Sequence, residues 1–248
     1  MKVTNATPPR PPSLHLLVRR EDIDPERLGG RVVVVIDVLF ATSTIVRALG
    51  AGLAAVYPAS DDDDARQAAR LRPDAVVAGE YLARTLPDHA PATPLALAAR
   101  LHEGGELVYF TTNGTRAIAA CRAAAAVYAG ALTNAAALAR HIAREHPGMP
   151  VLLVCAGSLG RFCVEDFVGA GHLARALRRC AEYAPTDAAL GAEFASLGVE
   201  PGAALAGSRV GRMLAGAGLE QEIAHAADCD SCEVIPVLRD GVLVRAAA

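Results

Sequence analysis

The stretch Tyr109-Phe110-Thr111-Thr112-Asn113-Gly114-Thr115-Arg116 places hydroxyl and amide side chains and a glycine between an apolar run and an alanine-rich one. Residues 106–110 are short, apolar and β-prone, and residues 117–126 have a helix-forming composition, so a strand, a turn at 111–115 and a helix are predicted. The N–H groups and hydroxyls of such a turn, at the positive end of a helix dipole, suit a phosphate or a sulfonate. A capped turn without a ligand also accounts for these residues.

The same alternation of strand and helix extends along most of the chain. Apolar runs predict strands, and the segments of helical spacing between them predict helices. The expected strands lie at residues 13–18, 31–37, 54–57, 75–78, 106–110, 127–129 and 151–155, and the expected helices at 41–50, 61–71, 95–102, 134–145, 165–179, 209–214 and 221–227. This order predicts an α/β fold with a mixed, mostly parallel sheet and helices on both faces.

The remaining segments complete this expected architecture. Asp240-Gly241 between two apolar runs, 234–238 and 242–245, predicts a C-terminal β-hairpin. The proline-rich residues 1–12 are expected to be a flexible lead-in to a single domain at 13–248. Residues 81–94 are expected to form a long loop of the kind that serves as a lid or substrate wall, and residues 182–207 show only a weak helical pattern.

Composition excludes several classes of protein. The 248 residues are 52% hydrophobic with a formal net charge of −3, and the basic residues are scattered, which argues against nucleic-acid binding. Charged residues and prolines interrupt the apolar runs before they reach the roughly 20 residues of a membrane span. The start of the chain lacks the apolar region of a signal peptide. We therefore expect a cytoplasmic protein without membrane or nucleic-acid partners.

Polar side chains follow several of the predicted strands. Asp37 with Thr42 and Ser43, Glu80 after Gly79, the 111–115 turn and the segment 155–166 all lie at such positions. Ligands bind at the carboxyl ends of strands in open α/β sheets. One cleft is therefore expected to combine an anion site with three or four carboxylates, as in a Mg²⁺-dependent phosphoryl site. Each acid alone also suits a helix cap or a salt bridge, and the roles of Glu165 and Asp166 relative to each other stay open.

Several segments are similar, in the same order, to one known family. They are Val35-Ile36-Asp37-Val38-Leu39-Phe40-Ala41-Thr42-Ser43-Thr44, Ala78-Gly79-Glu80, Thr111-Thr112-Asn113-Gly114-Thr115-Arg116, Leu132-Thr133-Asn134-Ala135, and Cys155-Ala156-Gly157 with Gly160-Arg161-Phe162 and Glu165-Asp166. From about residue 13 onward the chain resembles the 2-phosphosulfolactate phosphatases of coenzyme M biosynthesis. The resemblance implies a three-layer α/β fold and Mg²⁺-dependent hydrolysis of a phosphate monoester on a sulfonated three-carbon acid.

The resemblance also implies the site residues. Asp37, Glu80, Asn113 and Asp166 are carried over by position, and the three acids among them are the expected catalytic residues and Mg²⁺ ligands. The substrate, a small phosphate ester, is expected to contact Thr42, Ser43, Thr112, Asn113, Gly114, Thr115, Cys155, Gly157 and Arg161. A homodimeric assembly is left open.

Two departures from the family pattern bear on the substrate. Phe40 stands where the family has an arginine, which would pair with phosphate or sulfonate oxygens. Residues 81–94 replace a glycine-rich segment. The alternative to a 2-phosphosulfolactate-like phosphatase is therefore a relative with an altered substrate, or a non-catalytic one that binds a phosphorylated small molecule.

A second mechanism is suggested by the residues themselves. Cys155 and Arg161 have the spacing by which cysteine phosphatases wrap a phosphate while a thiolate attacks. No histidine directly precedes Cys155, and Gly157 and Gly160 are not placed as in that loop. The metal route is the favoured hypothesis.

Overall fold

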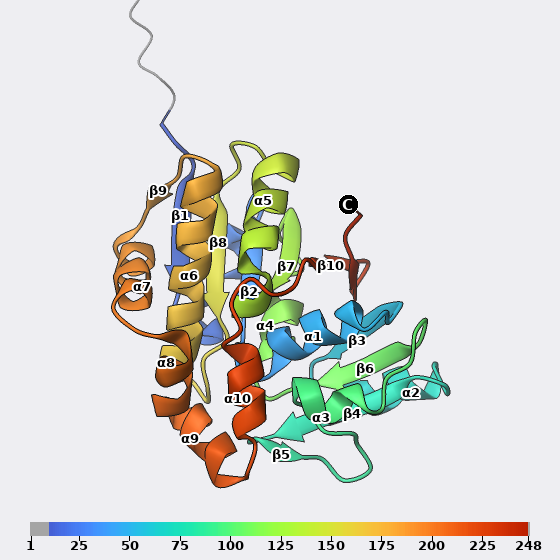
Figure 1. Cartoon of the computed structure of the whole chain (residues 1–248). Coiled ribbons are helices and arrows are strands. Elements are labelled where there is room, and N and C mark those ends of the chain that lie inside the picture. Colours follow the sequence, from blue (N-terminus) through green and yellow to red (C-terminus); the bar gives the residue numbers. More distant parts are fainter. Residues whose placement is uncertain (1–9, 248) are drawn as a thin grey trace, which may run out of the picture.

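The computed structural model describes residues 10–247, in which one mixed sheet of eleven strands runs through the molecule (Figure 1). The strand order is β5-β4-β6-β3-β11-β10-β7-β2-β8-β1-β9. The strands are β1 (Ser13–Leu17), β2 (Val32–Ile36), β3 (Ala55–Ala59), β4 (Val76–Tyr81), β5 (Arg84–Thr85), β6 (Glu106–Phe110), β7 (Ala126–Gly130), β8 (Val151–Cys155), β9 (Ala184–Pro185), β10 (Pro236–Arg239) and β11 (Val242–Arg245).

The C-terminal hairpin β10–β11 lies in the middle of this sheet. It joins a parallel group, β4, β6 and β3, to a second parallel group, β7, β2, β8, β1 and β9, through antiparallel pairs. Only one residue pair links β10 to β7 and one links β11 to β3. Figure 1 shows β4 and β6 running across the direction of β2 and β8.

Helices cover both faces of the sheet, which gives the expected three layers. Along β2, Val32, Val34 and Ile36 belong to a core with residues of α5 and α6, whereas Val33 and Val35 belong to a core with residues of α1 and α4. The helices are α1 (Ala41–Gly50), α2 (Asp62–Arg70), α3 (Pro94–Ala98), α4 (Gly114–Ala120), α5 (Ala135–Glu145), α6 (Val164–Cys180), α7 (Asp187–Leu197), α8 (Pro201–Gly207), α9 (Arg209–Gly216) and α10 (Glu220–Ala226). The predicted α/β fold with a C-terminal hairpin is confirmed.

Several predicted elements differ from those observed. Residues 182–207 form β9, α7 and α8, and the supposed loop 81–94 contains β5, which pairs back onto β4. The helix after β6 begins at Gly114, three residues earlier than predicted, and ends at Ala120. Most of the predicted lead-in at 1–12 lies outside the described residues. No helix in the described part combines the length and apolarity that a membrane crossing requires.

Candidate active site

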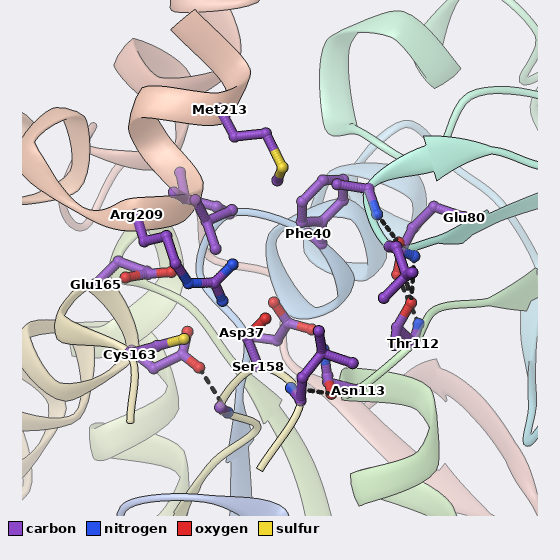
Figure 2. Close-up of a pocket in the computed structure, with 17 residues that line it drawn as sticks. Asp37, Phe40, Glu80, Thr112, Asn113, Ser158, Cys163, Glu165, Arg209 and Met213 are labelled. Carbon is purple, nitrogen blue, oxygen red and sulfur yellow. Dashed lines mark hydrogen bonds between the residues drawn. The ribbon is translucent and has the colours of Figure 1, made fainter. Parts of the chain in front are cut away.

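A pocket lies where the carboxyl ends of β2, β4, β6 and β8 meet α9 (Figure 2). It offers about 80 Å³ of space for the centres of water-sized molecules. Its lining includes four acids, Asp37, Glu80, Glu165 and Asp166. The bulk of its remaining polar lining comes from the turns after β6 and β8. The predicted convergence of the three acids Asp37, Glu80 and Asp166 with Asn113 is therefore present in the fold.

Asp37 is held by the turn that connects β2 to α1. The Thr42 hydroxyl lies 3.0 Å from both the N–H and the carbonyl oxygen of Asp37, and the Ser43 hydroxyl donates to the Val38 carbonyl over 2.6 Å. The Asp37 carboxylate accepts the N–H groups of Phe40 and Ala41. Thr42 and Ser43 were predicted to contact substrate, but their hydroxyls are used within this turn and neither residue lines the pocket.

Gly114 allows the start of α4 to approach Asp37 closely. A Cβ atom at this position would overlap both the Asp37 carboxylate and the Ala41 side chain. Gly114 is therefore needed so that the two turns can pack closely. It had been predicted to contact substrate instead.

Glu80 connects the end of β4 to the turn after β6. Its Oε1 accepts the N–H of Thr112 over 2.6 Å, and its Oε2 accepts the N–H of Ala83 over 2.6 Å and the Thr112 hydroxyl over 3.1 Å. The Thr112 hydroxyl in turn accepts the N–H of Leu82. Three donors on one buried carboxylate are a strong fixed connection, because hydrogen bonds to a charged group are stronger than neutral ones.

The predicted anion cradle is consequently smaller than expected. The N–H and hydroxyl of Thr112 serve Glu80, and Thr115 exchanges hydrogen bonds with Thr111. Thr115 is buried and does not line the pocket. Of the predicted turn, Thr112 and Asn113 face the cavity, and the Asn113 Oδ1 atom is 3.4 Å from the N–H of Leu159.

Asp166 and Glu165 occupy the first turn of α6, and both are buried. The two carboxylate oxygens of Asp166 accept the N–H groups of Val38 and Gly157, over 3.0 and 3.1 Å. These bonds fix α6 to the turns after β2 and β8. Glu165 lines the same pocket, so the two neighbours that the sequence could not separate both contribute carboxylates.

Crowded negative charge shifts the acidity of these groups. Burial, followed by the charge of Glu80, raises the pKa of the Asp37 carboxyl to about 7, against the opposing effect of its backbone N–H donors. Burial, with the charges of Asp37 and Glu165, raises the pKa of Asp166 well above its ordinary value. A cation in this pocket would relieve the repulsion among these groups.

One helix contributes pocket residues that the sequence did not indicate. Arg209, Val210 and Met213 come from α9, which follows the region of weak pattern. Figure 2 shows the Arg209 guanidinium directed into the pocket toward Asp37. Arg209 is the only cation among the described residues that line the pocket.

The cysteine route does not match the geometry. Cys155 is fully buried at the end of β8 and outside the pocket lining, and burial raises the pKa of its thiol well above the ordinary value. A nucleophilic cysteine requires the opposite shift. Arg161 is exposed and, like Cys155, lies outside the pocket lining, whereas Gly157 lines the pocket.

The donor chemistry of the pocket fits Mg²⁺. No group of three or more His, Cys, Asp or Glu side chains in residues 10–247 is arranged as a ready-made metal site. Mg²⁺, however, commonly takes only one or two carboxylates and completes its shell with waters and substrate phosphate. Asp37, which is partly accessible and surrounded by like charges, fits that role.

The fold and the pocket together define an α/β protein with an acidic site for a small ligand at convergent strand ends. A family model described as 2-phosphosulpholactate phosphatase matches residues 17–241. The chain belongs to this family.

Proteins similar to this chain include two named probable 2-phosphosulfolactate phosphatase. The one from Deinococcus radiodurans is 35% identical, over 92% of this chain and 96% of its own length. The one from Symbiobacterium thermophilum is 41% identical, over 60% of this chain and 64% of its own length.

Proposed function

We propose that this protein is a Mg²⁺-dependent phosphatase that hydrolyses a small acidic phosphate monoester of the 2-phosphosulfolactate type. The observation that carries the proposal is the convergence of Asp37, Glu80 and Asp166 with Arg209 in one pocket. Membership of the family and the names of the relatives support the phosphatase activity. The cytoplasmic location, the homodimer and a role in coenzyme M biosynthesis stay predictions.

Asp37 would hold Mg²⁺ directly. Glu80 and Asp166, the other acids expected as ligands, accept backbone N–H groups and would face the ion from the surrounding turns. When bound, the ion supplies positive charge against the phosphoryl oxygens. Glu80 and Asp166 each use both carboxylate oxygens to fix surrounding turns. The bond from the Val38 N–H to Asp166 fixes the turn that carries Asp37.

The chain's own residues then position the ester. The Arg209 guanidinium suits paired oxygens of a phosphoryl or carboxylate group, and the Asn113 amide lies on the opposite side of the pocket (Figure 2). In hydrolysis, a water oxygen bonds to phosphorus while the bond from phosphorus to the ester oxygen breaks. The water gives up a proton and the departing alcohol oxygen takes one, so the step needs a group that accepts the first proton and a donor for the second.

Phosphate release tests the proposal. The purified protein is assayed on a panel of small phosphate monoesters with Mg²⁺ or with EDTA, and its fold is checked by circular dichroism. We expect release from at least one ester with Mg²⁺ and none with EDTA. Absence of release from every ester by a folded protein would remove the proposal.

The alternative is a relative that binds a phosphorylated ligand without consuming it. Phe40 and Arg209, the single cation among the described lining residues, support this alternative, because they offer few partners for an anionic substrate. It predicts that a phosphate ester raises the melting temperature while its concentration stays constant.

A further inference from the structure

One side of the pocket is apolar. Phe40, Leu82, Val210 and Met213 line it, together with Leu39, and Leu159 lines the opposite side near Asn113. Figure 2 shows Phe40 and Met213 on the side of the pocket away from Asn113 and Ser158. The acids lie deeper, between the turns. A ligand whose phosphate reached Asp37 would therefore place its other end against hydrocarbon.

Several of these apolar side chains are left open to solvent. The exposed fraction is 46% for Leu82, 56% for Leu159 and 40% for Met213. Exposed single hydrophobic residues are common, but these three border one cavity. Core packing therefore does not explain their presence at this position.

Two of these residues, and one neighbour, have an unusual backbone conformation. Leu82, Ala83 and Leu159 have φ values of 53°, 61° and 54°, in the left-handed region. A side chain at such a position costs about 1–2 kcal/mol relative to the right-handed region, and glycine is the residue that avoids this cost. Strain of this kind gathers at ligand sites. Contact with an apolar group of a ligand accounts for leucine at two of these positions.

The charges of the pocket also favour a ligand with few anionic groups. Arg209 is the single lining cation in the described part of the chain, and four carboxylates share the cavity with it. Arg116 is turned away, since it donates to the Ser60 carbonyl and stacks over Phe110. A sulfonated acid phosphate carries a carboxylate and a sulfonate besides its phosphate. The second of these anions would have no cationic side chain to meet.

We propose that the substrate is a phosphate monoester that carries an apolar group and at most one further anion. The apolar group packs against Phe40, Leu82 and Met213, and the further anion pairs with Arg209. This inference rests on the proposed phosphatase function and names the substrate class of that site.

A matched pair of esters tests the inference. 2-Phospholactate and 2-phosphosulfolactate differ in that a methyl hydrogen is replaced by a sulfonate, and 2-phospho-3-phenyllactate has a larger apolar group. We expect kcat/KM to be at least about ten-fold higher for each apolar ester than for the sulfonated one, the scale of a single apolar contact in a pocket. An equal or higher kcat/KM for 2-phosphosulfolactate would overturn the inference.

Variants of the apolar side show whether it causes the preference. Phe40→Arg adds a cation and should shift the ratio of kcat/KM about ten-fold or more toward the sulfonated ester. Met213→Ala should lower kcat/KM for the phenyl ester more than for 2-phospholactate. Leu71→Ala removes an apolar side chain that is 74% exposed and outside the pocket, and should change neither ratio. Unchanged ratios in both pocket variants, with unchanged melting temperatures, would contradict the assignment.

Failure of the phosphatase proposal is distinguishable from failure of this one. If no ester is hydrolysed, the same three esters are compared by their effect on the melting temperature of the wild-type protein. A larger rise with the apolar esters supports the inference even without turnover. A larger rise with the sulfonated ester, or no rise with any ester, overturns it.

Discussion

Asp37 and Glu80 face one pocket but are held in opposite ways. Glu80 is buried and accepts three hydrogen bonds that tie together two turns. Asp37 is partly accessible and receives the N–H groups of its own turn, and the burial of its carboxyl, followed by the charge of Glu80, raises its pKa to about 7. Two carboxylates that look alike in the sequence thus differ in role. Glu80 maintains the shape of the site, whereas Asp37 is available for chemistry.

Asp37→Asn should give the largest effect on rate. The amide can still accept a backbone N–H but cannot exchange a proton or bind Mg²⁺ with the same charge, so we expect phosphate release to fall on the order of a thousand-fold. The melting temperature should stay equal or rise, because a repelled negative charge is removed. Steady-state kinetics and thermal unfolding measure the two effects.

The control for this variant is Asp63→Asn, which neutralises an exposed acid in the first turn of α2, outside the pocket. It should retain wild-type kinetics. Full activity of Asp37→Asn would show that the Asp37 carboxylate is not needed for the reaction.

Glu80→Gln should act mainly on stability. The amide N–H₂ group would face an N–H donor, Thr112 or Ala83, and one buried donor would lose its acceptor, at about 1–3 kcal/mol. Urea unfolding measures this loss. Glu233→Gln makes the same change at an exposed ion pair and should cost less than about 1 kcal/mol. Equal stability of the two variants would show that the Glu80 connection is dispensable.

Gly114→Ala tests the spacing between the two turns. The added methyl group would overlap the Asp37 carboxylate and Ala41, and overpacking of this kind costs about 1–3 kcal/mol. Gly216→Ala, at an exposed helix end with open space around it, is the matched control and should be neutral or stabilising. Differential scanning calorimetry compares the two. A neutral Gly114→Ala would mean that the turns can separate without loss.

A pH dependence of stability is also expected. The pKa of Asp37 is raised from 3.8 to about 7, so the native chain binds this proton more tightly than the unfolded chain. The stability that Asp37 contributes is therefore full below about pH 4 and is lost as the pH rises through about 7. In EDTA, the melting temperature of Asp37→Asn minus that of the wild type should increase over this window. A constant difference would indicate an ordinary pKa.

The sequence predicted the strand-end acids well because β-branched runs end abruptly at them. Val32–Ile36 precedes Asp37, and apolar β4 residues precede Glu80. It did not predict which donors these acids would use, since Thr112 is brought to Glu80 by strand pairing between β4 and β6. The turn residues therefore suggested a larger anion cradle than the fold provides.

Arg209 and Met213 were missed for a different reason. They follow α7, whose apolar residues lie on both sides: Ala189 and Ala192 are buried, whereas Phe194 and Leu197 are exposed. Without one apolar face, the helical period of α7 is hard to detect. A helix was predicted at 209–214, but its position over the pocket cannot be inferred from local pattern.

A crystal structure with Mg²⁺ and inorganic phosphate tests the central claim most directly. We predict Mg²⁺ bonded to Asp37, with the phosphate in the same pocket beside Asn113. Mg²⁺ or phosphate bound elsewhere, with the Asp37 carboxylate contacting only protein atoms, would contradict the account.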